Sequence, residues 1–305
     1  MCCLFGFVDY GQHFTRKQRS RLLSVLSVAC EDRGTDATGI SYNYYGRQYI
    51  YKRPLAAHLM WYRVPTDATI VMGHTRMTTQ GSETNNENNH PFHGYAGGNH
   101  FALAHNGVLY NDKTLRKTMK LPATKIETDS YIAVQLLEKF GKLNFDGLQF
   151  MAEALEGSFT ITALSDRDEL FFVKGNNPMC IYHFPETGIY IYASTEEILQ
   201  KALVQVSFRL GPMERVRMHT GEILCINAQG QMTRSHFDDS KLCPFPPAWT
   251  LWEAYAPVKR PYAEADYLDD LKSVSMFYGL YPEDIDALVD DGMDPMEIEQ
   301  MLYFG

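Results

Sequence analysis

The chain begins MCCLFGFVDYG (residues 1–11), and the interpretation of the whole sequence depends on this stretch. The run CLFGFV (3–8) is mostly apolar and a glycine follows at position 11, so it predicts a buried β-strand. Chain termini usually fray, but a strand within a sheet holds its end in place. Cys2, directly before this strand, is therefore expected at a fixed position.

Cys2 has the chemistry of a nucleophile that carries its own base. Removal of Met1, which is expected when the second residue is small, leaves a free α-amine on Cys2. Such an amine titrates near ~7.7–8.0, so at neutral pH it can accept the proton of the thiol. The alternative is that a cysteine at position 2 is an accident of sequence, and position 2 alone does not decide between the two.

The bulk composition is that of a globular, core-forming protein, with 45% hydrophobic and 21% charged residues among 305. A formal net charge of −9 argues against nucleic acid or an anionic membrane surface as the main partner. No apolar stretch reaches the ~18 residues of a membrane span, and the N-terminus lacks the basic region of a signal peptide. We therefore expect a cytoplasmic protein.

The six cysteines contain no C-x-x-C pair, and the sequence has no H-E-x-x-H motif. These are the common spacings of zinc ligands, so we expect neither a metal site nor a cofactor. Most of the cysteines are expected to be buried free thiols.

The pattern along the chain predicts one main domain and an appendage. Residues 16–33 have helical apolar spacing that ends at Gly34, and residues 128–140 predict a second helix with Thr128 or Asp129 near its N-cap. Alternating segments predict hairpins at 37–53, 158–174 and 179–194. The composition shifts at SKLCPFPPAW, so we expect a main domain at 2–240, a Pro/Trp-rich linker at 241–262 and a small acidic helical tail at 263–305.

Polar residues in three separate motifs offer the remaining parts of an amide-hydrolysing site. Arg76 in GHTRMTTQGS can grip a carboxylate, although such an arginine is often a surface ion-pair partner. Asn106 and Gly107 in HNGVLYN can form an oxyanion hole, although Asn-Gly is also the commonest hairpin turn. Asp129 in ETDSYIA can either cap a helix or bind a substrate ammonium.

In combination and order, these motifs resemble the class II glutamine amidotransferase domain. The matching segments cover residues 2 to about 210 and are the MC start, RGTDATGI, GHTRMTTQGS, NNHPF, AHNGVLYN, TDSYIA, LEGSFTITAL and FFVKGNNPMCIY…ASTEE. The resemblance implies an α+β fold of the Ntn (N-terminal nucleophile) hydrolase type, a four-layer αββα sandwich, followed here by a short helical C-terminal extension. It also implies hydrolysis of L-glutamine to glutamate and ammonia through a γ-glutamyl thioester on Cys2.

The resemblance further implies a role for each matching residue. Cys2 would be the nucleophile, and Asn106 and Gly107 would bind the oxyanion. Arg76 would hold the α-carboxylate of glutamine and Asp129 its α-ammonium. The other pocket and supporting positions that it implies are Thr79 and His90 at the substrate, and Arg33 and Asp36 beneath the N-terminal residue.

The sequence departs from the family pattern near the nucleophile. Cys3 stands where the family usually has glycine, and it either packs inward as a small hydrophobe or introduces redox sensitivity. Met77 stands where the family commonly has an aromatic residue, and Gln80 where it frequently has a histidine. These two differences concern the wall of the pocket and its closing loop, not the catalytic residues. His74 and His105 are expected to be packed or hydrogen-bonded histidines.

Family members usually continue into a synthase domain that consumes the ammonia. Here only about 70 residues follow, and they contain no Gly-rich phosphate loop. We therefore expect a separate ammonia-accepting synthase subunit, with the tail either packed on the domain or docking that subunit. Two alternatives remain: an Ntn-type amidase of another γ-glutamyl or acyl amide, and a non-catalytic regulatory protein that keeps the fold. The oligomeric state stays open.

Overall fold

The computed structural model describes residues 2–242 and 280–293 and the single positions 268, 272, 275, 298 and 301. The chain divides into two compact units, residues 1–247 and 248–305. Apart from its first two positions, the expected linker at 241–262 lies outside the described residues. The expected boundaries of the domain, linker and tail therefore stay predictions.

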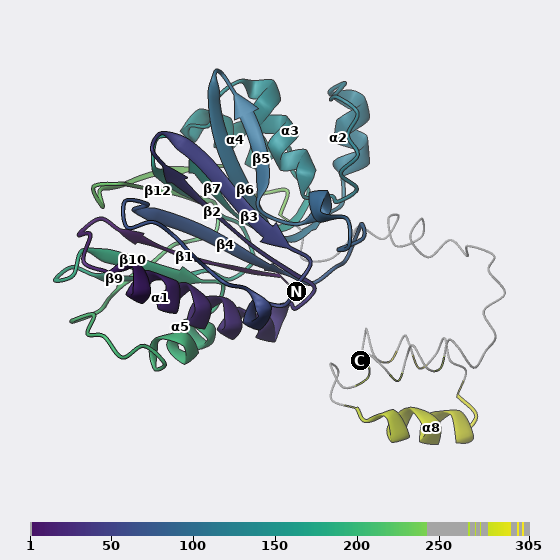
Figure 1. The fold of residues 1–305 in the computed structure, drawn as a ribbon. Helices are drawn as coiled ribbons and strands as arrows, with labels where there is room; N and C mark the ends of the chain where they lie inside the picture. The colour runs from purple at the N-terminus through teal and green to yellow at the C-terminus, as the bar shows by residue number, and fades with distance from the viewer. Residues whose placement is uncertain are drawn as a thin grey trace. The chain divides into compact units, whose positions relative to one another are not determined.

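The first unit is built on two sheets in which all strand pairs are antiparallel (Figure 1). The strands of the seven-stranded sheet are β1 (Cys3–Asp9), β2 (Ala37–Tyr44), β3 (Arg47–Arg53), β4 (Ile70–Arg76), β9 (Cys180–Phe184), β10 (Ile189–Ala193) and β11 (Glu214–Val216). Their order across the sheet is β11-β9-β10-β1-β4-β2-β3. The first strand of the chain thus lies in the middle of this sheet.

The second sheet has six strands in the order β13-β12-β8-β7-β6-β5. They are β5 (Phe92–Ala96), β6 (Asn99–Leu109), β7 (Gly157–Ser165), β8 (Glu169–Lys174), β12 (Glu222–Asn227) and β13 (Met232–His236). The hairpins expected at 158–174 and 179–194 are confirmed as β7–β8 and β9–β10, and the one at 37–53 as β2–β3.

Helices cover the outer face of each sheet (Figure 1). The helical elements of the first unit are α1 (Arg16–Ala29), η1 (Cys30–Arg33), η2 (Ala57–Leu59), η3 (Asn86–Asn88), α2 (Asp112–Thr118), α3 (Tyr131–Phe140), α4 (Phe145–Ala154) and α5 (Glu196–Leu203). Helices α1 and α5 contact each other on the seven-stranded sheet, while α3 and α4 contact each other on the six-stranded sheet.

Three separate apolar clusters fill the spaces between these layers. Phe5 and Phe7 pack with the apolar face of α1, while Leu4 and Val8 pack between the two sheets. A third cluster lies between the six-stranded sheet and α3 and α4. Because successive residues of a strand point to opposite faces, β1 is buried on both sides. The result is the four-layer αββα sandwich that the sequence predicts.

Helix ends differ in detail from the expectation. The helix predicted at residues 16–33 is α helical only as far as Ala29, as α1. Its last four residues form the 3₁₀ turn η1 before Gly34. The N-cap of α3 is Ser130, so Thr128 and Asp129 lie near the N-cap as expected, but no side chain makes a cap hydrogen bond. Gly141 ends α3 in the left-handed conformation. Asp129 is thus free of a capping role and bonds elsewhere.

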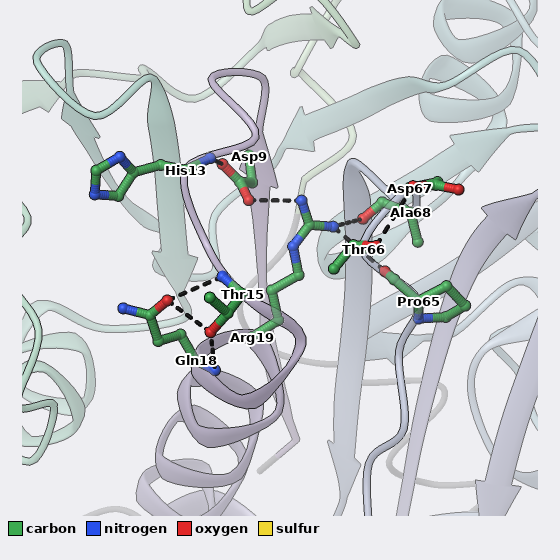
Figure 2. Close-up of polar contacts among 9 residues, drawn as sticks. All are labelled: Asp9, His13, Thr15, Gln18, Arg19, Pro65, Thr66, Asp67 and Ala68. Atoms are coloured by element: carbon green, nitrogen blue, oxygen red, sulfur yellow. Dashed lines mark hydrogen bonds and ion pairs between the residues drawn. The ribbon is translucent and has the colours of Figure 1, made fainter.

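A buried ion pair joins the end of β1 to the first turn of α1 (Figure 2). The carboxylate of Asp9 lies 2.7 Å from the guanidinium of Arg19, and both side chains are fully buried. Arg19 also donates to the carbonyl of Ala68 at 2.6 Å, and Asp9 accepts the backbone N–H of His13 at 3.0 Å. The pair therefore ties the end of β1, the start of α1 and the loop before β4 together.

Replacing Asp9 by asparagine is expected to lower the free energy of unfolding by about 3–5 kcal/mol, because the buried charge of Arg19 loses its partner. Urea unfolding measures this loss. Asp32→Asn is the matched control, since its ion pair with Lys201 is about half exposed; that change is expected to cost less than about 1 kcal/mol. Equal losses in the two variants would show that Asp9 and Arg19 do not stabilise the fold as a pair.

The second unit contains α8 (Pro282–Asp290), which begins with a proline and has Glu283 and Asp284 in its first turn. Both features suit a helix N-terminus, as the sequence predicts for this segment. Ile285 and Ile298 are the buried centre of a small apolar cluster. The other expected tail helices lie mainly outside the described residues. In the part of the chain that is described, no helix has the length and apolar character needed to cross a membrane.

Candidate active site

Cys2 directly precedes β1, so it lies at the end of a strand in the middle of the seven-stranded sheet. Because Cys3 pairs with Thr75 in β4, Cys2 comes next to the end of that strand. Its sulfur accepts the backbone N–H of Met77 at 3.4 Å. Its carbonyl accepts a hydrogen bond from Nε of Arg33 at 3.0 Å. The side chain is half-buried, and hydrogen bonds at its sulfur and at its backbone carbonyl give the sulfur a defined position.

The surroundings of Cys2 act on its thiol in opposite directions. Burial raises the pKa of the Cys2 thiol, and this effect outweighs the Met77 hydrogen bond, which lowers it. The charge of Arg76 also lowers this pKa, whereas the charge of Asp129 raises it. The net rise keeps the resting thiol protonated at neutral pH, and both charged residues lie close enough to act on the sulfur.

Arg76 is the last residue of β4, and it is a buried residue rather than a surface ion-pair partner. Its guanidinium donates to Oδ1 of Asn89 at 2.7 Å and to the carbonyls of Gln80 and Gly81 at 2.6 and 2.9 Å. The arginine therefore fixes the shape of the loop that follows β4. Thr79 is exposed on this loop, and its expected role at the substrate stays a prediction.

Residues of the NNHPF segment close the same loop from its other end. Asn88 donates to the carbonyl of Ser82 and to the carboxylate of Glu127 at 2.9 and 2.8 Å. Asn89 donates to the carbonyl of Glu83 at 2.8 Å. The peptide bond between His90 and Pro91 is cis. The hydrogen bonds of its two asparagines therefore hold this segment against the loop that follows β4.

Asp129 is a buried carboxylate on the six-stranded side of the site. One of its oxygens accepts the backbone N–H of Leu109 at 2.6 Å. Because Leu109 ends β6, three residues after Asn106, this bond connects the carboxylate to the strand that carries the candidate oxyanion hole. The charge of Asp129 also acts on the guanidinium of Arg76, so two opposite buried charges lie within range of each other.

Asn106 and Gly107 lie inside β6, so the alternative of a hairpin turn at Asn-Gly is wrong. Gly107 has a φ of +143°, and a Cβ on it would lie 1.9 Å from the carbonyl oxygen of Ser158. Only glycine fits there. The amide of Asn106 donates to Oγ of Ser194 at 3.3 Å, and the same oxygen accepts the N–H of Leu4 at 2.9 Å.

Ser194 therefore connects the candidate oxyanion hole to Leu4 in β1, which is two residues after Cys2. Asn177 holds the backbone of Asn106 from the other side, by donating to its carbonyl at 2.8 Å. Neither Ser194 nor Asn177 was singled out from the sequence. Both lie in quoted segments, ASTEE and GNNPM, but the bonds they make cross the sheets and leave no local signal.

Three buried histidines pack behind these residues. His74 contacts the carbonyl of His105 at 3.0 Å through Nε2, and its pKa is lowered by burial to about 3. The ring of His90 lies 4.1 Å from that of His74 and 4.3 Å from that of Phe92. Burial also lowers the pKa of His90, which keeps its ring neutral. These side chains shape the pocket wall and are poor proton carriers near pH 7.

Arg33 and Asp36, the two residues expected to support the site, contact the N-terminal residue and the loop after β4. Asp36 accepts the backbone N–H of Thr78 at 2.6 Å, and its own N–H donates to the carbonyl of Arg76. Together with Arg33, it braces the loop and the N-terminal residue. Among the described residues, no group of three His, Cys, Asp or Glu side chains is placed to hold a metal ion.

Known proteins resemble this chain in sequence and in fold. Residues 74–201 match a family described as "Glutamine amidotransferase domain". Glutamine–fructose-6-phosphate aminotransferase (isomerizing) of Staphylococcus epidermidis is 30% identical over 190 residues, which are 59% of this chain and 30% of the relative. 7-Cyano-7-deazaguanine synthase of Sulfolobus acidocaldarius is 22% identical over 223 residues, 70% of this chain and 47% of the relative.

Among solved structures, glutamine phosphoribosylpyrophosphate amidotransferase of B. subtilis, complexed with ADP and GMP, aligns with a TM-score of 0.61. Its sequence is 19% identical, and the alignment covers 79% of this chain and 51% of the other. This likeness shows the shared αββα fold. The chain thus spans between about a third and a half of the length of the relatives it resembles.

Proposed function

We propose a function from the premise that this chain contains a glutamine amidotransferase domain, homologous to those of the class II (N-terminal nucleophile) enzymes. The proposed reaction is hydrolysis of L-glutamine to glutamate and ammonia through a γ-glutamyl thioester on Cys2. The observation that supports it best is that two buried charges act on the Cys2 thiol, Arg76 lowering its pKa and Asp129 raising it. These two charges match the two charged groups of a free amino acid.

In the proposed first step, the sulfur of Cys2 attacks the side-chain carbonyl carbon of glutamine. The thiol pKa is raised by burial, so the resting thiol needs a base, and the α-amine of Cys2 accepts the proton. The amide of Asn106 and the N–H of Gly107 stabilise the negative oxygen. The amine then returns the proton to the leaving nitrogen, which departs as ammonia.

In the second step, water attacks the thioester carbon and the Cys2 sulfur leaves, which releases glutamate. The same amine accepts the proton of this water. Through both steps Arg76 is proposed to hold the α-carboxylate and Asp129 the α-ammonium, with Thr79 and His90 completing the pocket. Arg33 and Asp36 keep the nucleophile and the loop in place through the bonds described above.

We further propose that the ammonia passes to a synthase on a separate subunit. The related proteins named above include an aminotransferase and a synthase, and this chain matches only part of each of them. The cytoplasm is the proposed setting, because its reducing environment keeps a nucleophilic thiol free.

Asp129→Asn is expected to remove the preference for substrates with an α-ammonium group, because the amide keeps the bond to Leu109 but loses the charge. The wild-type chain should prefer glutamine over its analogue lacking the α-amine. The kcat/KM for glutamine divided by that for the analogue should fall about 30- to 100-fold in Asp129→Asn. Asp168→Asn is the control, since Asp168 bonds Asn43 at the far end of β7.

An unchanged ratio in Asp129→Asn would remove Asp129 from the ammonium site. Failure of the wild-type chain to release ammonia from glutamine would contradict the proposed function itself. Hydrolysis of other γ-glutamyl amides in preference to glutamine would favour the alternative amidase.

A further inference from the structure

Two buried thiols touch in the layer between α1 and the seven-stranded sheet. The sulfur of Cys3 lies 3.0 Å from the sulfur of Cys30, and both side chains are fully buried. Both are free thiols. A disulfide bond requires the two sulfurs to approach by a further ~1 Å.

This pair is separate from the nucleophile although Cys2 and Cys3 are neighbours in sequence. Cys3 belongs to the apolar cluster beneath α1, together with Phe5, whereas Leu4 packs between the sheets. The sulfur of Cys2 instead contacts the backbone of Met77. Because side chains alternate along β1, Cys30 faces Cys3 and lies on the opposite side of the sheet from the Cys2 sulfur.

We propose that Cys3 and Cys30 form an oxidative modification site, at which a peroxide produces a reversible disulfide bond. The thiolate of Cys3 attacks one oxygen of hydrogen peroxide, which gives a sulfenic acid and releases water once the departing hydroxide is protonated. The sulfur of Cys30 then attacks the sulfenic sulfur, loses its proton and releases a second water. Two thiols are oxidised by two electrons and one peroxide is reduced.

The surroundings of the pair favour Cys3 as the attacking sulfur. Burial raises the pKa of the Cys3 thiol, but hydrogen bonds from Cys30 and Ser194 outweigh it, and the net shift is downward. Burial raises the pKa of Cys30, and the neighbouring Cys3 raises it further. Since the thiolate is the reactive form, Cys3 reacts first and Cys30 resolves the product.

The disulfide would join two elements that hold Cys2. Cys30 is the first residue of η1, and Arg33 at the end of η1 donates to the carbonyl of Cys2. The carbonyl of Cys30 also accepts the hydroxyl of Thr75 in β4 at 3.1 Å. The disulfide therefore crosslinks β1 to the turn behind the nucleophile and does not include the Cys2 sulfur.

Peptide mapping of the full chain after treatment with hydrogen peroxide tests this site. After alkylation under denaturing conditions and proteolysis, we expect the peptides containing Cys3 and Cys30 to be joined, with a mass two hydrogens below their sum. Dithiothreitol should separate them, and Cys180 and Cys225 should be alkylated. Cys30→Ala should lose the crosslinked peptide, whereas the matched control Cys180→Ala should keep it.

A Cys2–Cys3 crosslink, or alkylation of Cys3 and Cys30 to the same extent as Cys180, would overturn the proposal. If Cys30→Ala does not fold, the wild-type map decides alone, because fragmentation of the crosslinked peptide distinguishes Cys3 from its neighbour Cys2. The readout is covalent and does not require glutamine hydrolysis. Its outcome is therefore independent of whether the proposed function holds.

Discussion

Cys2→Ala is expected to reduce glutamine hydrolysis at least ~10⁴-fold, because it removes the only atom that forms the proposed thioester. The remaining parts of the site still bind glutamine, so binding should persist while turnover is lost. Initial rates of glutamate and ammonia release measure the effect. Since Cys2 is half-buried and its sulfur makes a weak contact with Met77, the thermal unfolding midpoint should change little.

Cys225→Ala is the matched control for this experiment. Cys225 is a buried thiol in β12, in the other sheet, and its removal should leave kcat/KM for glutamine unchanged. Glutamine turnover by Cys2→Ala at the wild-type rate would eliminate the thioester mechanism. A large loss of kcat/KM in Cys225→Ala would instead show that removal of a buried thiol lowers activity through lost stability, and not through loss of a nucleophile.

The second large effect is expected for Asn106→Ala, which should lower kcat for glutamine by about 10²–10³-fold. The amide stabilises the charge that develops on the oxygen during attack, so KM should change much less than kcat. Ser194 loses a donor in this variant but keeps the N–H of Leu4, so β1 should stay in place. Steady-state kinetics over a range of glutamine concentrations separates the two parameters.

Asn43→Ala provides the comparison for Asn106. Asn43 is also a buried asparagine on a strand, and it donates to the carbonyl of Ser165 at 2.7 Å, away from the site. This variant should lose stability and keep kcat. If KM rises in Asn106→Ala with kcat unchanged, the residue binds the ground state and is not part of an oxyanion hole.

The strands of the fold could be predicted because their pattern is local. β1 is an apolar run, and the hairpin of β2 and β3 turns at Tyr45 and Gly46, both with positive φ. Helices α2, α4 and α5 were missed. α2 and α5 are only seven and eight residues long, and the ten-residue α4 contains Gly147 in its first turn, so their apolar spacing is weak evidence on its own.

The residue types of the candidate site could be predicted, but their bonding could not. Asp129 looks like a helix cap in the sequence, yet its carboxylate bonds the end of β6, because tertiary contacts override local capping preference. Ser194 acts through Leu4 and Asn106, which are far from it in sequence. The contact of Cys3 with Cys30 likewise requires the packing of α1 against β1.

The most direct test of the account is mass spectrometry of the chain after reaction with an electrophilic glutamine analogue. We expect one adduct, on Cys2, in molecules that lack Met1 and have a free α-amine, and glutamine in excess should protect against it. Labelling should parallel the loss of ammonia release. Full glutamine hydrolysis by molecules that retain Met1, or inactivation with the adduct on another residue, would contradict the assignment of Cys2 as nucleophile and base.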